Sequence, residues 1–165
     1  MEFSIESFRM PRYRELPDVG LYLDQTVKYI NRYLAPLGCV EITASMVSNY
    51  VKKGYISNPV RKLYDAEQIA YLFFIAVAKS ALPMEHIARL FEMQRKVYPS
   101  DVAYDYFCVE LENILRFIFN LRSDMEDSGT TDTEAKSMLR ATIIAVAHII
   151  YLNSQFIRLE ERVEE

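Results

Sequence analysis

The segment from Ile69 to Ala81 constrains the fold most, because it is apolar on nearly every side of the helix that it predicts. Asp65 precedes it as a candidate N-cap, and Gln68 stands where a capping-box partner would lie. A helix that is apolar all round must be surrounded by other elements. The chain has only four glycines, few for the tight turns of an all-β architecture. We therefore expect a mainly all-α fold built around this helix.

Apolar residues spaced three and four apart predict further helices on both sides of this segment. Pro36 with Gly38, Gly54, Pro83 and Pro99 separate them. The first of these helices is expected to be capped by Asp18 or Asp24, and the second by Thr43. The first expected helix ends near residue 34. The others span about residues 43–53, 65–81, 83–98, 100–122 and 132–162.

Charge is distributed unevenly along the chain, whose net charge is −4. Residues 1–98 carry a net charge of +3, and residues 99–165 carry −7. Between residues 40 and 64 a single acidic residue, Glu41, opposes four basic ones. These are Lys52, Lys53, Arg61 and Lys62. Screening confines each field to about 10 Å at 0.1 M salt, so such a patch can bind phosphates inside an acidic protein. Solvated charges without a partner are the alternative.

The helix expected after Thr43 presents small polar groups near its N-terminal end. They are Thr43, Ser45, Ser48 and Asn49. Hydroxyl and amide groups at that end can meet base edges or phosphates, and the helix dipole favours the anionic DNA backbone. Lys52 and Lys53 follow at the far end of the helix. The loop after them returns Arg61 and Lys62 towards the same side. This order predicts a grip on phosphates on both sides of a DNA groove.

The segment from Thr43 to Phe91 resembles the winged helix-turn-helix of the MerR regulators. In that family a recognition helix ends in a tyrosine, and a glycine, an apolar pair, a proline-bearing wing and two further helices follow. The similar positions are Tyr50, Gly54, Tyr55, Ile56, Pro59, Arg61, Lys62, Leu63, Tyr64 and Asp65. The resemblance implies that Tyr50 and Tyr64 either pack the wing against the recognition helix or touch the DNA backbone. Plain core packing is the alternative for both tyrosines.

The recognition helix departs from the MerR pattern at its centre. Where that family has Arg-Tyr-Tyr-Glu, this chain has Ser48-Asn49-Tyr50-Val51, so the usual phosphate-binding arginine is absent. The wing is also shorter and lacks its usual glycine. The chain is therefore identified as a member of an uncharacterised bacterial family, a domain of unknown function, that is distantly related to MerR.

Three parts are expected along the chain. Residues 1–17 predict an extended N-terminal arm, and residues 18–98 a winged helix-turn-helix DNA-binding domain. Residues 99–165 predict a helical C-terminal region for dimerisation or effector binding, whose two helices are joined by the polar linker Ser123–Asp132. Its two helices carry more apolar surface than a hairpin can hide, so the DNA-binding domain, a second copy of the chain, or both must cover it. A homodimer through these helices is the arrangement that we expect. Aromatic residues in the first of them are typical of a core, with a small effector pocket as the alternative. They are Tyr104, Tyr106, Phe107, Phe117 and Phe119.

No catalytic, metal-binding or cofactor-binding motif is recognisable in the sequence. His86 and His148 have no cysteine or acidic partner at metal-ligand spacing. Cys39 and Cys108 are too few for a disulfide framework, which favours a reducing cytoplasm. We therefore expect a cytoplasmic protein that is not an enzyme and needs no cofactor.

The mostly apolar stretch from Leu139 to Ile157 predicts a buried helix. It contains Arg140, His148 and Asn153, which are costly in hydrocarbon, so no membrane span is expected. The function expected from the sequence is a regulator that binds double-stranded DNA. A helical protein–protein interaction module that keeps the fold without DNA binding is the alternative, favoured by the acidic balance and the missing arginine.

Overall fold

The computed structural model describes residues 5–126 and 132–164, in which the regular structure is helical apart from two isolated β-bridges. The α-helices follow in the order α1 (Leu23–Leu34), α2 (Ala44–Lys52), α3 (Ala66–Ala78), α4 (Met84–Val97), α5 (Ser100–Ile118) and α6 (Glu134–Glu164). Two short 3₁₀ helices cover Tyr13–Glu15 and Ala35–Leu37. The expected all-α fold is confirmed.

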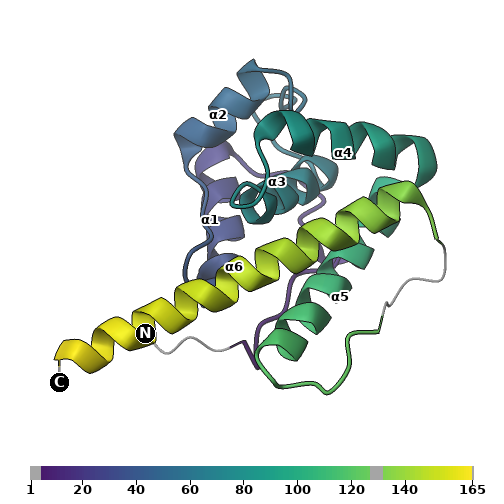
Figure 1. The fold of residues 1–165 in the computed structure, drawn as a ribbon. Coiled ribbons are helices and arrows are strands. Elements are labelled where there is room, and N and C mark those ends of the chain that lie inside the picture. Colours follow the sequence, from purple (N-terminus) through teal and green to yellow (C-terminus); the bar gives the residue numbers. More distant parts are fainter. Residues whose placement is uncertain (1–4, 127–131, 165) are drawn as a thin grey trace.

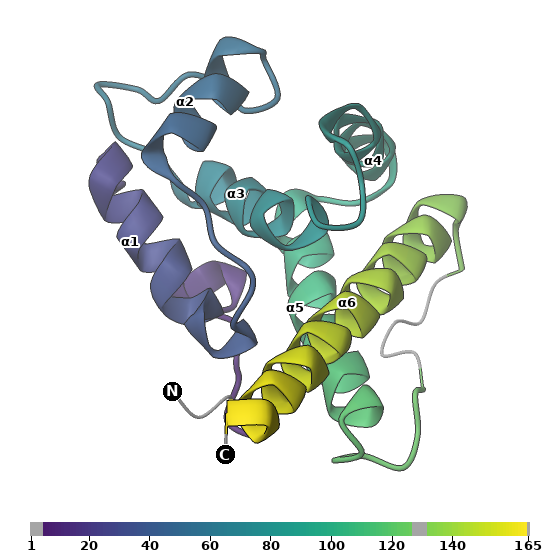
Figure 2. The same cartoon turned by 60° about the vertical axis from the view of Figure 1, so that its left-hand side comes forward.

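Helix α3 lies in the middle of the molecule, and α1, α4, α5 and α6 pack around it (Figures 1 and 2). The expected capping box begins this helix. The backbone N–H of Gln68 donates to Asp65 Oδ1, and the N–H of Asp65 donates to Gln68 Oε1, both at 2.8 Å. From Gln68 to Ala78 every residue except Tyr71 is buried. The apolar segment is therefore the central helix that its sequence requires.

Glycine and proline separate the helices as the sequence predicts. Gly38 ends the 3₁₀ turn after α1 with φ 77°, and Gly54 follows α2 with φ 79°. Both angles lie in the left-handed region that favours glycine. Pro83 and Pro99 occupy the N-cap positions of α4 and α5.

The expected cap of the first helix was wrong. Helix α1 begins at Leu23 with Tyr22 at the N-cap, rather than Asp18 or Asp24. The backbone N–H of Tyr22 is satisfied by the side-chain oxygen of Gln25 at 3.0 Å. A glutamine reaching back from the first turn thus replaces the expected carboxylate cap.

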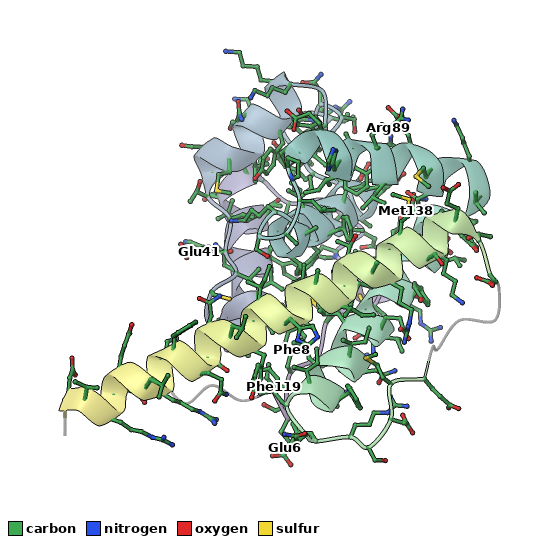
Figure 3. All side chains as sticks on the ribbon, in the orientation of Figure 1. Glu6, Phe8, Glu41, Arg89, Phe119 and Met138 are labelled. Carbon is green, nitrogen blue, oxygen red and sulfur yellow. The ribbon has the colours of Figure 1, made fainter. Side chains whose placement is uncertain are left out.

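The N-terminal arm, described from residue 5 and including the 3₁₀ helix Tyr13–Glu15, belongs to the core. Its buried side chains are Ile5, Phe8, Met10 and Leu16. The Tyr104 hydroxyl on α5 donates to the carbonyl of Pro11 at 2.8 Å. Arg116, near the end of the same helix, donates to the carbonyl of Phe8 at 3.2 Å. Phe8 is labelled in Figure 3. The arm therefore runs along α5 as a strap.

Glu112 on α5 holds the middle of this strap. The carboxylate is 5% exposed, and it accepts from the backbone N–H of Met10 at 3.0 Å and from Arg12 Nη2 at 2.9 Å. The hydrogen bonds from Arg12 to the Glu112 carboxylate raise the pKa of the guanidinium above its ordinary value, against the opposing effect of burial. The pair is thus a charge-assisted clamp between the arm and α5.

The three parts expected along the chain share one hydrophobic core. Apolar residues of the arm, of α1 to α4 and of α5 and α6 all belong to the same buried cluster. Of the expected linker Ser123–Asp132, residues 127–131 lie outside the described residues. Arg140 of α6 donates to the carbonyl of Met125 at 2.7 Å and to the buried Glu110 at 3.2 Å. This residue therefore ties the segment after α5 to both α5 and α6.

Helix α6 crosses α5 and then extends past the other helices (Figure 1). Its buried face near the middle includes Ile143, Val146, Ala147 and Ile150, as expected for a helix of the core. By length and composition alone, α6 is apolar enough to cross a membrane. Helices in the core of globular proteins meet the same criterion. Leu152, Phe156 and Ile157 are exposed, in contrast to the buried helix that the sequence predicts from Leu139 to Ile157. The reason is that no other part of the described chain reaches this end.

Candidate nucleic-acid interface

Helix α2 has a buried apolar face and an exposed polar face. Thr43 is its N-cap, as predicted, and its hydroxyl oxygen accepts from the backbone N–H of Met46 at 3.2 Å. Val47 and Tyr50 are buried. The exposed face is a stripe at helical spacing that consists of Ser45, Ser48, Asn49 and Lys52. We call these four residues the polar stripe. Four residues predicted from the sequence as DNA contacts thus share one solvent-facing side.

The two candidate tyrosines are buried beneath this surface rather than exposed on it. Tyr50 is 6% exposed and Tyr64 is 4% exposed, and burial raises the pKa of each hydroxyl. The Tyr50 carbonyl accepts from the backbone N–H of Tyr55 at 2.9 Å, where the chain leaves α2. Their burial corresponds to the packing alternative rather than to contact with a partner.

A tight turn carries the second basic cluster. The backbone N–H of Leu63 donates to the carbonyl of Val60 at 2.9 Å, and the two residues between them have positive φ, 53° for Arg61 and 66° for Lys62. Positive φ at both central positions defines a type I′ turn, which favours asparagine and glycine. We call Val60–Leu63 the basic turn. A non-glycine residue in this conformation costs about 1–2 kcal/mol, and backbone strain of this kind often accompanies a functional surface.

The base of the basic turn is fixed to the body of the protein. Leu21 and Tyr64 form an antiparallel bridge with N–H to carbonyl distances of 3.0 and 2.8 Å. Gly20, with φ 81°, precedes the bridge, and a Cβ there would lie 3.0 Å from Leu63 Cβ. Gly20 therefore allows the close approach. The bridge was not foreseen, because the residues that pair are more than 40 positions apart and neither flanking sequence reads as a strand.

Gln68 fixes the loop between α2 and the basic turn. Its side-chain amide donates to the carbonyls of Ser57 at 3.0 Å and Asn58 at 3.2 Å. The same side chain closes the capping box of α3. The box was predictable from the spacing to Asp65, but its contacts with the loop depend on the tertiary path of the chain.

The four basic residues predicted as phosphate contacts are all exposed. Within the part of the chain that the structure describes, none of Lys52, Lys53, Arg61 and Lys62 forms a salt bridge. Some arginines elsewhere in the described residues pair with carboxylates, as Arg12 does with Glu112, whereas others, such as Arg32, do not. Charges left unpaired on one segment keep their full attraction for an external anion. Figures 1 and 2 show α2 and the loop after it at the end of the molecule opposite the lower end of α5.

The reactive side chains outside this segment do not come together. Cys108 is buried, and this burial raises the pKa of its thiol to about 12, which keeps it protonated at neutral pH. Cys39 is exposed on another part of the fold. His86 and His148 are both exposed, although His148 was expected within the core. In the described residues no group of histidine, cysteine and carboxylate side chains is placed to hold a metal ion.

A family model described as Domain of unknown function (DUF1836) matches residues 11–107. The matched region begins in the arm and ends within α5. It therefore includes the polar stripe, the basic turn and Tyr104 of α5, whose hydroxyl donates to the Pro11 carbonyl. Neither a curated protein nor a solved structure matches the chain.

Proposed function

The chain belongs to the Domain of unknown function (DUF1836) family, and we propose that it is a transcriptional regulator that binds double-stranded DNA through α2 and the basic turn. The observation that carries the proposal is the set of four exposed basic side chains that form no ion pair with the residues that the structure describes. They lie at the end of the polar stripe and in the basic turn. Lysine and arginine in this arrangement bind phosphates, and the stripe between them supplies groups that read base edges.

In this proposal α2 is the recognition helix of a short winged helix-turn-helix of the MerR type. The helix order, the glycine after α2 and the turn before α3 support it. Ser48 stands where MerR regulators have an arginine, so Asn49 is the residue best suited to read a base. Its amide can pair with the N6 and N7 atoms of adenine. Lys52 and the basic turn supply the phosphate contacts.

The proposed regulator is a homodimer through the exposed end of α6. Leu152, Phe156, Leu159 and Val163 are between 51% and 86% exposed. Their spacing of four, three and four residues is that of a coiled-coil seam, which a second copy of the same helix complements. Burying side chains of this size contributes roughly 1.5–3 kcal/mol each. A two-fold dimer also presents two copies of α2 to successive half-sites on DNA.

The dimer is tested by placing a carboxylate in the seam. Phe156→Glu is expected to convert the protein to a monomer in sedimentation equilibrium, because the charge cannot be buried between two copies. Arg158→Glu, in the same turn of α6 but outside the seam, is the matched control and is expected to leave the mass unchanged. A wild-type protein that sediments as a monomer at all concentrations, or a dimeric Phe156→Glu variant, contradicts the proposal.

DNA binding is tested by fluorescence anisotropy with a labelled pool of random duplexes. At about 50 mM salt we expect measurable affinity, with a logarithmic salt dependence whose slope is reduced by roughly one unit in Lys52→Ala. Lys96→Ala, which removes an exposed lysine at the end of α4, is the control and is expected to leave the slope unchanged. Absence of duplex affinity under these conditions refutes the proposal.

A helical interaction module is the second candidate function. The exposed seam of α6 and the net charge of −4 favour it. If the protein is such a module and does not bind DNA, Lys52→Ala is expected to leave its interactions with protein partners unchanged.

A further inference from the structure

A cavity of about 250 Å³ lies between α3, α4, α5 and the first turns of α6. Its innermost walls are buried aromatic and aliphatic side chains, Phe74, Leu90, Phe91, Tyr104 and Phe107. Val102, which is 50% exposed, lines its outer part. An apolar cavity of about 150 Å³ holds a benzene molecule. The space here therefore suits a planar molecule of one or two fused rings.

The aromatic wall of the cavity is fixed by contacts between its own rings. The centre of the Phe74 ring lies 5.2 Å from that of Phe107, edge to face, and 5.6 Å from that of Phe91. The Tyr71 ring meets Phe91 edge to face with the two centres 4.5 Å apart. Rings that pack on one another in this way restrain each other's orientation. The space between them is therefore formed before a ligand enters, as is usual for small-molecule sites.

One polar group at the edge of the cavity has more hydrogen-bond acceptors than protons. The Tyr71 hydroxyl donates to Gln94 Oε1 at 2.8 Å, and the Ser100 hydroxyl donates to Glu67 Oε1 at 3.0 Å. The Gln94 amide nitrogen donates to the carbonyl of Tyr98 at 2.7 Å. The two hydroxyl oxygens lie 3.1 Å apart, and the first two bonds use the single proton of each. The Tyr71 oxygen can therefore accept from a donor on a ligand.

The charged side chains around the cavity favour a neutral ligand. The Glu67 carboxylate belongs to the polar group just described and repels an anion. The Arg95 guanidinium lies over the Tyr71 ring, 5.0 Å from its centre, and the Lys136 ammonium lies 5.6 Å from the centre of the Tyr106 ring. Both cations thus already face aromatic rings of the chain. A ligand of either sign would meet a like charge at the rim.

We propose that this cavity binds a small neutral aromatic molecule of one or two fused rings that carries an N–H or O–H donor. The rings pack against Phe74, Phe91 and Phe107, and the donor meets the Tyr71 hydroxyl oxygen. Of the aromatic residues that the sequence suggested for a pocket, Tyr104, Tyr106 and Phe107 line this cavity, whereas Phe117 and Phe119 do not. The site is separate from α2 and the basic turn, so it does not depend on DNA binding.

Three probes test these features by isothermal titration calorimetry on the full chain. Indole is neutral and carries an N–H donor, indene has the same fused-ring size without a donor, and indole-5-carboxylate adds a negative charge. We expect indole to bind about fivefold more tightly than indene, because only indole forms the hydrogen bond. The carboxylate is expected to bind more weakly than indole by more than about tenfold, because its charge must leave water beside Glu67.

The fluorescence of indole itself shows what kind of site it occupies. The chain contains no tryptophan, so indole emission that is excited beyond the tyrosine absorption band comes from the ligand alone. Entry into the apolar cavity is expected to shift this emission to shorter wavelength, whereas binding at a solvated surface leaves it unchanged.

Two variants then assign the site to its residues. Tyr71→Phe with Gln94→Leu removes the hydroxyl together with the oxygen that accepts from it, so no orphaned acceptor remains. This double variant is expected to reduce the preference for indole over indene to less than about twofold. Ala103→Phe fills the cavity and is expected to weaken indole binding by more than about tenfold, whereas Ala145→Phe, at an exposed site of α6 outside the cavity, has no effect. Circular dichroism establishes that Ala103→Phe is folded, and if it is not, the double variant decides.

Any of three results overturns the proposal. The first is that indole does not bind at about 1 mM, a concentration that detects weak ligands of this size. The second is that indole-5-carboxylate binds as tightly as indole. The third is that the natural chain shows no preference for indole over indene, or that the preference persists in the double variant.

Discussion

Replacing Glu112 with glutamine is expected to lower the free energy of unfolding by about 3 kcal/mol, because it leaves Arg12 without its charged partner in a buried site. The carboxylate accepts from the Met10 backbone and from the Arg12 guanidinium, and it is 5% exposed. For a chain of this length the loss corresponds to a fall of about 9 °C in Tm. Urea denaturation followed by circular dichroism measures it.

Glu92→Gln is the matched control for this experiment. Glu92 pairs with Arg89 at 3.4 Å, but both side chains are more than half exposed. A solvated pair of this kind contributes no more than about 0.5 kcal/mol. If Glu112→Gln is no more destabilising than Glu92→Gln, the arm is not held by the buried clamp. The fold would then depend on the arm's apolar residues alone.

Replacing the centre of the basic turn by Asn-Gly is expected to stabilise the protein and weaken DNA binding at the same time. Asparagine and glycine adopt the positive φ of Arg61 and Lys62 with less strain, which favours the Arg61→Asn, Lys62→Gly variant by about 1 kcal/mol. The same variant removes two phosphate contacts, and we expect a loss of roughly 30-fold in duplex affinity at low salt. Thermal denaturation and anisotropy titration measure the two effects on one sample.

The control for the turn exchanges the two charges without removing them. Arg61→Lys with Lys62→Arg retains two cations and two strained residues, so its stability and its duplex affinity are expected to stay close to those of the natural chain. A stabilised Asn-Gly variant with unchanged affinity would show that the basic turn does not contact DNA. It would leave the proposed function to α2 alone.

Local chemistry explains why most helix boundaries were predictable. The capping box of Asp65 and Gln68, the Thr43 cap and the glycines at 38 and 54 each act within a few residues, so the sequence carries the whole signal. The exposed polar stripe of α2 follows from the helical period in the same way. The start of α1 was predicted incorrectly, because two aspartates offered a cap and the glutamine at position 25 supplied it instead.

The sequence by itself therefore determined the central helix α3, the all-α class and the position of the four unpaired basic residues along the chain. Only the tertiary structure decided that Glu112 binds the N-terminal arm, that Leu21 pairs with Tyr64, and that a cavity lies between α4 and α6. These features join residues far apart in the chain, and no local propensity specifies such pairs. The tyrosines at 50 and 64 illustrate the difference, because their positions were evident from the sequence and their burial was not.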